Sequence, residues 1–332
     1  MNKTLAKIRE SLGHMAMEWA PSDWLDTEVP ELNKVIGHKE KGLPYGRIIE
    51  ISGWESQGKS ALMMSIAALA QCDGAHVIWE DVENSFDPGW ARQRGMAACS
   101  CIKITSNNGS KNTCKLCGGE NSSTFGLDTD KLILLQPYVG KFMDVDPRTK
   151  KKTLSKEARL SNAQELCSEA EKCMEASAKT FKKRILVLDS IPALLTAGEA
   201  AAGIEGGNLR TNMDLPMFMS RLLRRWVGTA QVTNTLIVLV NQLRTNPMNK
   251  FGSPDYTPGG NAPLFYSHVR VRVNRIKGGK IMDKGNMVGI QGIMRALKNK
   301  SGGVEGSTVG YKLKFNGNVE FVPVSSLKRS DE

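Results

Sequence analysis

Residues 46–60 read GRIIEISGWESQGKS, an apolar strand that runs directly into a glycine-rich loop. The spacing matches G-x-x-x-x-G-K-[ST], the pattern of phosphate-binding loops. Gly53 and Gly58 let the backbone curl so that successive N–H groups point toward phosphate oxygens. Lys59 places a positive charge on the β- and γ-phosphates, and the Ser60 hydroxyl can ligate Mg²⁺. The helix predicted to follow aims its positive end at the same oxygens. The sequence therefore predicts a site for a nucleoside triphosphate.

Composition and charge limit the class of protein. The chain has 332 residues, 40% hydrophobic and 24% charged, enough for one large α/β domain with insertions or for two ordinary domains. No apolar run approaches the roughly 20 residues that span a bilayer, and the basic N-terminus lacks the apolar core of a signal peptide, so we expect no membrane partner. The net charge of +11 favours a polyanionic partner such as nucleic acid, although general solubility is an alternative. Seven cysteines, an odd number, argue against a disulfide framework and for a reducing, cytoplasmic compartment.

Strand and helix patterns alternate along the rest of the chain. Strands are predicted over residues 75–79, 131–136, 184–189 and 235–241, and helices over 87–95, 160–180 and 214–227. This alternation is typical of an α/β fold with a mainly parallel sheet and helices on both faces. Beyond Ser267 the pattern changes to HVRVRVNRI, VGIQGIMRAL and YKLKFNGNVEFVP, which predict antiparallel strands added at the C-terminal end.

Changes in composition suggest the domain limits. We expect residues 1–40 to form an N-terminal helix and an extended or turn-rich linker, and residues 41–332 to form the core. Two insertions interrupt this core. The first, at about 97–127, is rich in Cys, Ser, Asn and Gly, and the second, at about 141–158, is basic.

Polar residues at other strand ends indicate what happens to a bound triphosphate. Asp189 follows four apolar residues, where a carboxylate can hold Mg²⁺ through water or merely cap a helix. Glu83 could polarise a water for attack on the γ-phosphate, but spacing does not separate it from Glu80 and Asp81. Gln242 offers an amide that could sense the γ-phosphate.

Five separate motifs together resemble those of RecA-type recombinases, over residues 24 to 300 approximately, broken by the two insertions. They are GLPYGRIIEISGWESQGKS, EDVENSFDPGWA, RILVLDSIPALL, LIVLVNQLR with PGGNAPLFYSHVRVRV, and ALKNK at 296–300. The resemblance implies a RecA-like ATPase core and a DNA-dependent ATPase that forms filaments on single-stranded DNA and exchanges strands with a homologous duplex. The tail after Lys300 is too short for the separate C-terminal domain of bacterial RecA, and this size is compatible with a virus-encoded recombinase.

The resemblance also implies roles for single residues. The phosphate loop, from Gly53 through Glu55, Ser56, Gln57, Gly58 and Lys59 to Ser60, would hold ATP and Mg²⁺. Glu83 would activate water, because aligning Asp87-Pro88 with the family places that role there rather than on Glu80. Asp189 would support the metal, and Gln242 would couple the γ-phosphate to a DNA loop.

Two further pairs complete the implied ATP site. Asp87 and Trp90 fall where the family contacts adenine, although Trp90 could be an ordinary core residue. Lys298 and Lys300 would reach the ATP of a neighbouring subunit and neutralise charge that develops during phosphoryl transfer. Two solvated lysines at a strand end are the alternative.

DNA contact is expected from two loops. The first, at about 197–213, carries several glycines and Arg210. The second runs from about 243 to 260, and its predicted contacts are Arg244, Lys250, Phe251, Tyr256, Gly259 and Gly260. Cations for phosphates and an aromatic ring for bases are typical of single-strand binding. Ordinary surface loops have similar composition, but the position of the second loop directly after Gln242 favours DNA.

Four cysteines in the first insertion depart from the family pattern. Cys99-x-Cys101 and Cys114-x-x-Cys117 form two close pairs around a polar loop. Four thiolates so arranged suit tetrahedral Zn²⁺, which would order a segment too polar to form its own core. Free thiols are the alternative.

Two other functions stay open at this point. One is a RecA-fold DNA motor or recombination mediator without strand exchange, and the other is a DNA-binding paralogue that uses ATP only as a clamp. Glu83 argues against the clamp, because its carboxylate has little purpose without hydrolysis. Lys298 and Lys300 argue against the motor, since hexameric motors of this fold more often present an arginine finger.

Overall fold

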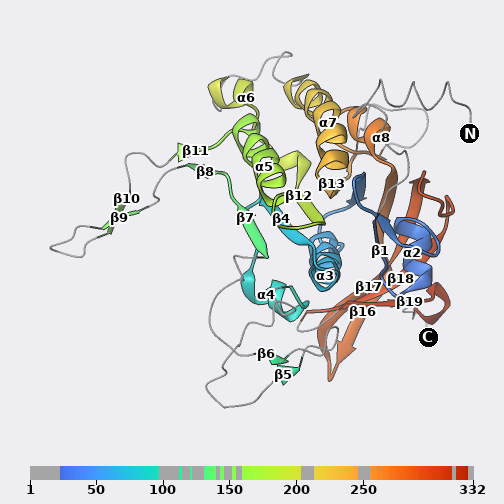
Figure 1. Cartoon of the computed structure of the whole chain (residues 1–332). Coiled ribbons are helices and arrows are strands. Elements are labelled where there is room, and N and C mark those ends of the chain that lie inside the picture. Colours follow the sequence, from blue (N-terminus) through green and yellow to red (C-terminus); the bar gives the residue numbers. More distant parts are fainter. Residues whose placement is uncertain are drawn as a thin grey trace, which may run out of the picture.

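A computed structural model describes residues 23–96, 112–113, 120–121, 131–139, 143–145, 152–154, 159–202, 213–245, 255–315 and 319–327. These residues contain a nine-stranded sheet in the order β19-β18-β17-β16-β3-β13-β12-β4-β7 (Figure 1). Its strands are β3 (Ile48–Gly53), β4 (His76–Asp81), β7 (Leu132–Leu135), β12 (Arg184–Asp189), β13 (Thr235–Gln242), β16 (Val269–Asp283), β17 (Asn286–Asn299), β18 (Thr308–Lys314) and β19 (Val319–Val322). Neighbours from β7 to β16 are parallel, and those from β16 to β19 are antiparallel. The predicted fold class is confirmed.

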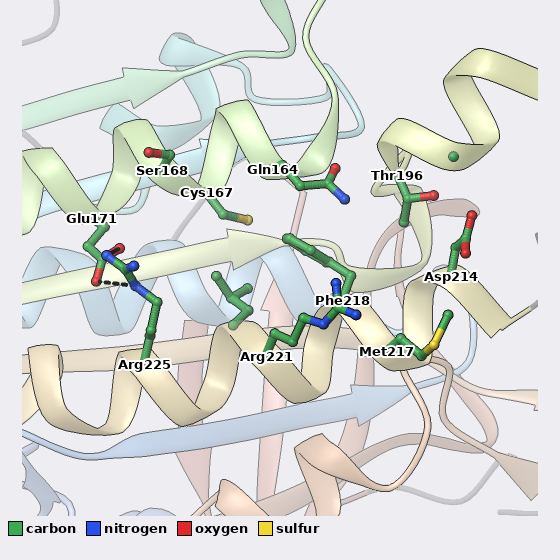
Figure 2. A pocket seen from close by; sticks show the side chains of 12 residues that line it. Gln164, Cys167, Ser168, Glu171, Thr196, Asp214, Met217, Phe218, Arg221 and Arg225 are labelled. Atoms are coloured by element: carbon green, nitrogen blue, oxygen red, sulfur yellow. Dashed lines mark hydrogen bonds and ion pairs between the residues drawn. The ribbon is translucent and has the colours of Figure 1, made fainter.

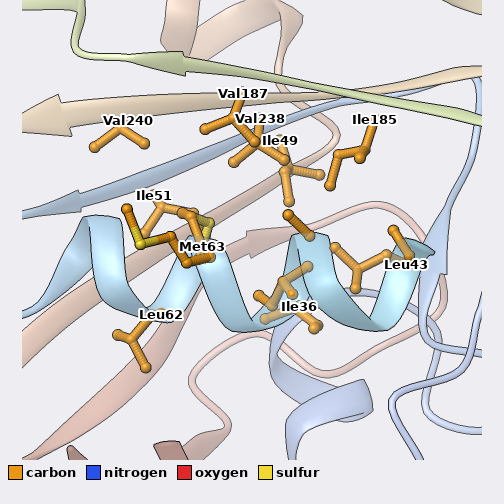
Figure 3. Packing of buried hydrophobic residues seen from close by; sticks show 14 of the residues in the cluster. Ile36, Leu43, Ile49, Ile51, Leu62, Met63, Ile185, Val187, Val238 and Val240 are labelled. Atoms are coloured by element: carbon orange, nitrogen blue, oxygen red, sulfur yellow. The ribbon is translucent and has the colours of Figure 1, made fainter. Parts of the chain in front are cut away.

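Helices cover both faces of the sheet, which is why its central strands are apolar on both sides. On one face, α5 (Ala163–Ser177) lies beside α7 (Asp214–Val232) (Figure 2). Both helices pack on alternate residues of β12 such as Leu186 and Leu188. On the other face, α3 (Lys59–Cys72) packs on Ile185 and Val187 (Figure 3). The central parallel strands β3, β4, β12 and β13 are thus buried almost throughout, whereas the edge strand β7 is mostly half-buried.

A short helix lies where the sequence predicts an extended or turn-rich linker. Pro30–Ile36 forms α2, and its Leu32, Val35 and Ile36 are fully buried in the same core as α3. Pro30 stands at the first turn of the helix, where its missing N–H costs nothing, so this proline begins a helix instead of breaking one. This part of the predicted N-terminal linker therefore packs as core. Residues 1–22, with the predicted N-terminal helix, lie outside the described residues.

Smaller elements surround the central sheet. They are β1 (Trp24–Leu25) with β2 (Leu43–Pro44), α4 (Pro88–Gln93), β5 (Asn112–Thr113) with β6 (Glu120–Asn121), β8 (Tyr138–Val139) with β11 (Arg159–Leu160), β9 (Met143–Val145) with β10 (Lys152–Leu154), α6 (Ala197–Ala202), β14 (Arg244–Thr245) with β15 (Asp255–Tyr256), and α8 (Ala262–Tyr266). Helix α6 shows that the first predicted DNA loop begins with a helical turn, which the glycine content of that segment did not indicate.

The cysteines of the core and the hydropathy of the helices bear on two expectations from the sequence. Cys167 is a buried free thiol, and Cys173 is a half-buried one. Across the described ranges, no helix has both the length and the hydropathy needed to span a membrane.

Candidate active site

The phosphate loop connects β3 to α3, and its two glycines are required by space. A Cβ atom at Gly53 would lie 2.5 Å from the carbonyl oxygen of Val273. Gly58 has a φ of 81°, and a Cβ atom there would lie 2.7 Å from Leu313 Cδ2. The loop can therefore lie close against β16 and β18 only because side chains are absent at both positions.

Lys59 is held inside this loop. It is 7% exposed, and its Nζ donates to the carbonyls of Gly53 at 3.2 Å and Trp54 at 2.8 Å. Burial lowers the pKa of the ammonium group, while Asp189 and Glu83 oppose that shift. A cation that rests on two carbonyls at the curl of the loop is placed to exchange them for phosphate oxygens.

Strand register brings the other predicted residues to the same edge of the sheet. Asp189 is paired with Asp81 across β12 and β4, and Gln242 is paired with Gly53 across β13 and β3. Because these strands are parallel, their carboxyl ends meet where ligands commonly bind in open α/β sheets.

Asp189 and Ser60 form a pair of oxygen donors beside Lys59. The Ser60 side chain forms a hydrogen bond with the Asp189 carboxylate. Burial raises the pKa of Asp189 to about 6; Glu83 adds to the rise, and the Ser60 hydrogen bond opposes it. Hydroxyl and carboxylate oxygens suit Mg²⁺, which usually takes few protein ligands and completes its shell with phosphates and water. Among the described residues, no group of three or more His, Cys, Asp or Glu is placed to hold a metal ion.

The three candidate acids at the end of β4 and just beyond it have different surroundings. Glu83 Oε1 accepts from Gln242 Nε2 at 2.8 Å and from the Ser190 hydroxyl. Asp81 instead accepts backbone N–H groups at 2.9 and 3.0 Å within its own loop. Glu80 is buried on the α5 side, where it accepts from the Cys167 thiol at 3.3 Å. Of the three, Glu83 alone lines the cavity described next.

These residues surround a cavity of about 470 Å³. Its walls include most of the predicted ATP-site residues, namely Glu55, Ser56, Gly58, Lys59, Ser60, Glu83, Trp90, Asp189 and Gln242. The sequence missed Arg94 and Arg275, and it missed the apolar cover formed by Met287, Ile290, Leu313 and Phe315. Arg94 follows no recognisable motif, and Arg275 is one of several regularly spaced basic residues on β16, so neither carried a distinguishing signal.

Three predicted residues do not line the cavity. The carbonyl oxygen of Gly53 accepts a hydrogen bond from Lys59 Nζ. Gln57 holds the loop against the sheet, because its side chain accepts from the Arg275 backbone N–H and its carbonyl accepts from the Tyr311 hydroxyl at 2.8 Å. Asp87 caps α4, its carboxylate accepting the Trp90 N–H at 2.6 Å.

The paired lysines lie apart from the cavity of their own chain. Lys298 Nζ donates to the carbonyls of Leu264 at 2.7 Å and Phe265 at 3.2 Å, at the end of α8. Burial, followed by the charges of Lys300 and Arg270, lowers the pKa of Lys298. Lys300 is exposed.

The second predicted DNA loop is closed by a short ladder in which Arg244 pairs with Tyr256, both exposed. Gly259 is buried with a φ of 93°, and Gly260 has a φ of 70° with a would-be Cβ 2.9 Å from Pro216. Backbone conformation and close packing therefore explain why both positions are glycine. Arg210, Lys250, Phe251 and the cysteines Cys99, Cys101, Cys114 and Cys117 lie outside the described residues.

A second cavity of about 400 Å³ lies between α5 and α7 (Figure 2). Glu171 and Arg225 form an ion pair at 2.9 Å on its wall, and Thr196 and Asp214 lie at the end near α6. No predicted site residue lines it.

Comparison with known proteins identifies the family of the chain. The family model for the RecA N-terminal domain matches residues 21–112 and 149–307. A curated relative, Protein RecA of Gluconobacter oxydans (strain 621H), is 30% identical over 259 residues, which cover 78% of this chain and 57% of the relative. The chain thus spans little more than half the length of that relative. On the family match and this identity together, the chain belongs to the RecA family.

Proposed function

We propose that this protein is a DNA-dependent ATPase that assembles on single-stranded DNA and catalyses homologous pairing and strand exchange. The observation that carries this proposal is the hydrogen bond between Gln242 and Glu83. It joins a carboxylate in the triphosphate cavity to the residue from which the second loop begins, so that the state of the nucleotide and the position of the loop can influence each other.

The residues of the cavity would divide the work of ATP hydrolysis. Backbone N–H groups of the loop and the Lys59 ammonium bind the phosphates, and the Ser60 hydroxyl with Asp189 would hold Mg²⁺. Bound Mg²⁺ would neutralise charge that develops on the transferring phosphate. Glu83 accepts the proton of the attacking water, and Trp90 offers an exposed ring for the base.

Filament assembly would complete this site. Lys298 does not reach the cavity of its own chain but sits at the surface end of α8. That position supports a role for Lys298 and Lys300 at the ATP of a neighbouring subunit, where a positive charge would stabilise the transition state. Arg244 and Tyr256, both exposed at the base of the second loop, would contribute a cation and a ring to DNA binding.

A strand-pairing assay tests the proposal. Purified protein, ATP, Mg²⁺, a single strand and a homologous duplex should give joint molecules, and a heterologous duplex should not. Hydrolysis stimulated by single strands without joint molecules would instead indicate a motor or mediator. DNA binding without hydrolysis would indicate the non-hydrolysing paralogue.

The zinc site stays a prediction that metal analysis can check. The four cysteines Cys99, Cys101, Cys114 and Cys117 should hold about one equivalent of Zn²⁺ in protein purified without chelator. Less than about half an equivalent counts against a structural site.

A further inference from the structure

Asn241 is a buried amide at the point where the second predicted DNA loop leaves the sheet. It is fully buried on β13, one residue before Gln242. Its Nδ2 donates to the Glu50 carboxylate at 2.9 Å and to the Pro258 carbonyl at 3.0 Å, and its Oδ1 accepts the Gln242 backbone N–H at 3.0 Å. Both amide hydrogens and the amide oxygen are therefore engaged.

The ion pair beside Asn241 fixes the orientation of this amide. Glu50 is fully buried on β3, and its carboxylate is paired with Arg270 on β16. A carboxylate held by arginine accepts hydrogen bonds and has none to donate, so the NH₂ group of Asn241 must face it. That orientation directs the second N–H to the Pro258 carbonyl and leaves the amide oxygen for the Gln242 N–H. The Glu50–Arg270 pair thus determines which atoms of the amide face the loop.

The two ends of the loop meet at this side chain. The departing chain enters β14 at Arg244, and the returning chain passes through Tyr256 on β15 before it reaches Pro258. The ladder between β14 and β15 has only two residues on each strand, which is too little pairing to hold its own position in water. The hydrogen bond from Asn241 to Pro258 connects the return of this ladder to the strand from which it departs.

The residue type at position 241 matches these contacts. The preceding positions 236–240 of β13 are all buried and apolar, so burial alone would favour a further apolar side chain. Such a side chain would leave the Pro258 carbonyl and one oxygen of Glu50 without this donor, and buried acceptors without a donor are unfavourable. The amide therefore serves the loop and β3 at the same time.

We propose that Asn241 is a positioning residue for single-strand binding. It fixes the short ladder at the base of the loop, so that Arg244 and Tyr256 meet the same strand of DNA together. This inference rests on the proposed function of that loop as a DNA contact. It assigns Asn241 no contact with DNA or ATP, and it predicts an effect on DNA affinity that is exerted through the ladder.

The test measures affinity for single strands and for nucleotide separately in the full chain. A short fluorescent oligothymidylate is titrated by anisotropy with a non-hydrolysable ATP analogue present, and the analogue alone is titrated without DNA. Asn241→Leu should weaken oligothymidylate binding about tenfold, and its affinity for the analogue should stay unchanged. The slope of log K against log salt should also decrease by about one, because Arg244 no longer meets its phosphate.

A double variant shows whether Asn241 acts through the ladder. Arg244→Ala alone should weaken DNA binding and reduce the salt slope by about one. Asn241→Leu combined with Arg244→Ala should lose little more than the larger of the two single losses, because both changes remove the same contact. Fully additive losses would overturn the proposal.

A matched control separates positioning from general loss of stability. Thr235 is fully buried at the other end of β13, and its hydroxyl forms a hydrogen bond with the Thr233 hydroxyl at 2.6 Å. Thr235→Val should lower the melting temperature but leave DNA affinity and the salt slope unchanged. If Asn241→Leu does not fold, Asn241→Ser replaces it, since a short hydroxyl cannot reach both Glu50 and Pro258, and the same selective loss of DNA affinity is expected.

The remaining outcomes distinguish this inference from the function on which it rests. Equal losses of DNA and nucleotide affinity in the Asn241 variants would show a general disruption and overturn the proposal. Unchanged DNA affinity in those variants, with wild-type protein that binds the oligothymidylate, would refute the positioning role alone. Wild-type protein that binds the ATP analogue but no oligothymidylate would refute the proposed DNA function, and with it the role of Asn241.

Discussion

Gln242 Nε2 donates to Glu83 Oε1 at 2.8 Å, so the last residue of β13 contacts the carboxylate that lies beyond the end of β4. The same carboxylate oxygen accepts from the Ser190 hydroxyl, which follows Asp189 at the end of β12. Three strand ends are thereby connected through one carboxylate. A residue so placed is fixed in orientation before any substrate enters, which favours a catalytic role.

Glu83→Gln should abolish most ATP turnover and leave binding intact. The amide keeps the size of the side chain and can still accept from Gln242, but it cannot take a proton from water. We expect DNA-stimulated hydrolysis to fall by about 100-fold or more, with unchanged affinity for ATP and single strands. Glu175→Gln, which changes an exposed carboxylate on α5 that does not line the cavity, is the control and should retain activity. Wild-type turnover in Glu83→Gln would refute the assignment.

The buried ion pair between Glu50 and Arg270 should be important for stability. Glu50 is fully buried on β3 and pairs with Arg270 on β16. Asn241 Nδ2 adds a hydrogen bond to Glu50 at 2.9 Å and another to the Pro258 carbonyl at 3.0 Å. Arg270→Met would leave the carboxylate without its cation, so the free energy of unfolding in urea should fall by about 3–5 kcal/mol.

A double variant separates this effect from loss of packing. Glu50→Leu combined with Arg270→Met removes both charges and should recover much of the lost stability. If the double variant is less stable than Arg270→Met alone, the ion pair is not the cause of the loss.

The phosphate loop and the parallel sheet could be predicted because their signals are local. The curl at Gly53 and Gly58 and the apolar strands need only residues near in sequence. Helix α2 was missed because Pro30 looks like a breaker, and only packing of Leu32 and Ile36 against the sheet reveals a helix start.

The choice among Glu80, Asp81 and Glu83 could not be made from the residues alone, because three acids lie within four positions. It depends on which way each side chain points from β4, and that follows from register with β12 and from contact with α5. Arg94 and Arg275 were missed for a related reason. Each reaches the cavity through tertiary packing, which leaves no spacing pattern in the sequence.

Lys298→Ala should lower DNA-stimulated hydrolysis without weakening ATP binding to the isolated protomer. The ammonium group contacts the end of α8 and not the cavity of its own chain, so its catalytic effect would require a neighbour. We expect a loss of about 100-fold in turnover, measured with saturating single strands. Mixing Lys298→Ala with Glu83→Gln should restore part of the activity, because some interfaces then combine an intact Lys298 with an intact Glu83. No recovery in the mixture would contradict a role across subunits.

Glu80 should make the stability of the protein depend on pH. It is fully buried on β4, its Oε1 accepts from the Cys167 thiol at 3.3 Å, and its Oε2 has no hydrogen-bond partner among the described residues. Burial raises the pKa of Glu80 from an ordinary value of 4.5 to about 7, and the Cys167 hydrogen bond opposes that rise. The other titratable groups near this pair are Cys173 and Glu171.

Proton linkage gives the direction in which stability changes with pH. Because the folded protein holds this proton more tightly than the unfolded chain, the contribution of Glu80 is fully present below pH 4.5 and is lost as pH rises through about 7. The shift corresponds to about 3 kcal/mol between these limits. Glu80→Gln removes the titrating group, keeps an acceptor for Cys167, and leaves Asp189, whose raised pKa acts in the same direction, unchanged. In urea unfolding, the variant should gain stability over the wild type as pH rises from about 5 to about 8, and a difference that stays constant with pH would show that Glu80 does not titrate in this range.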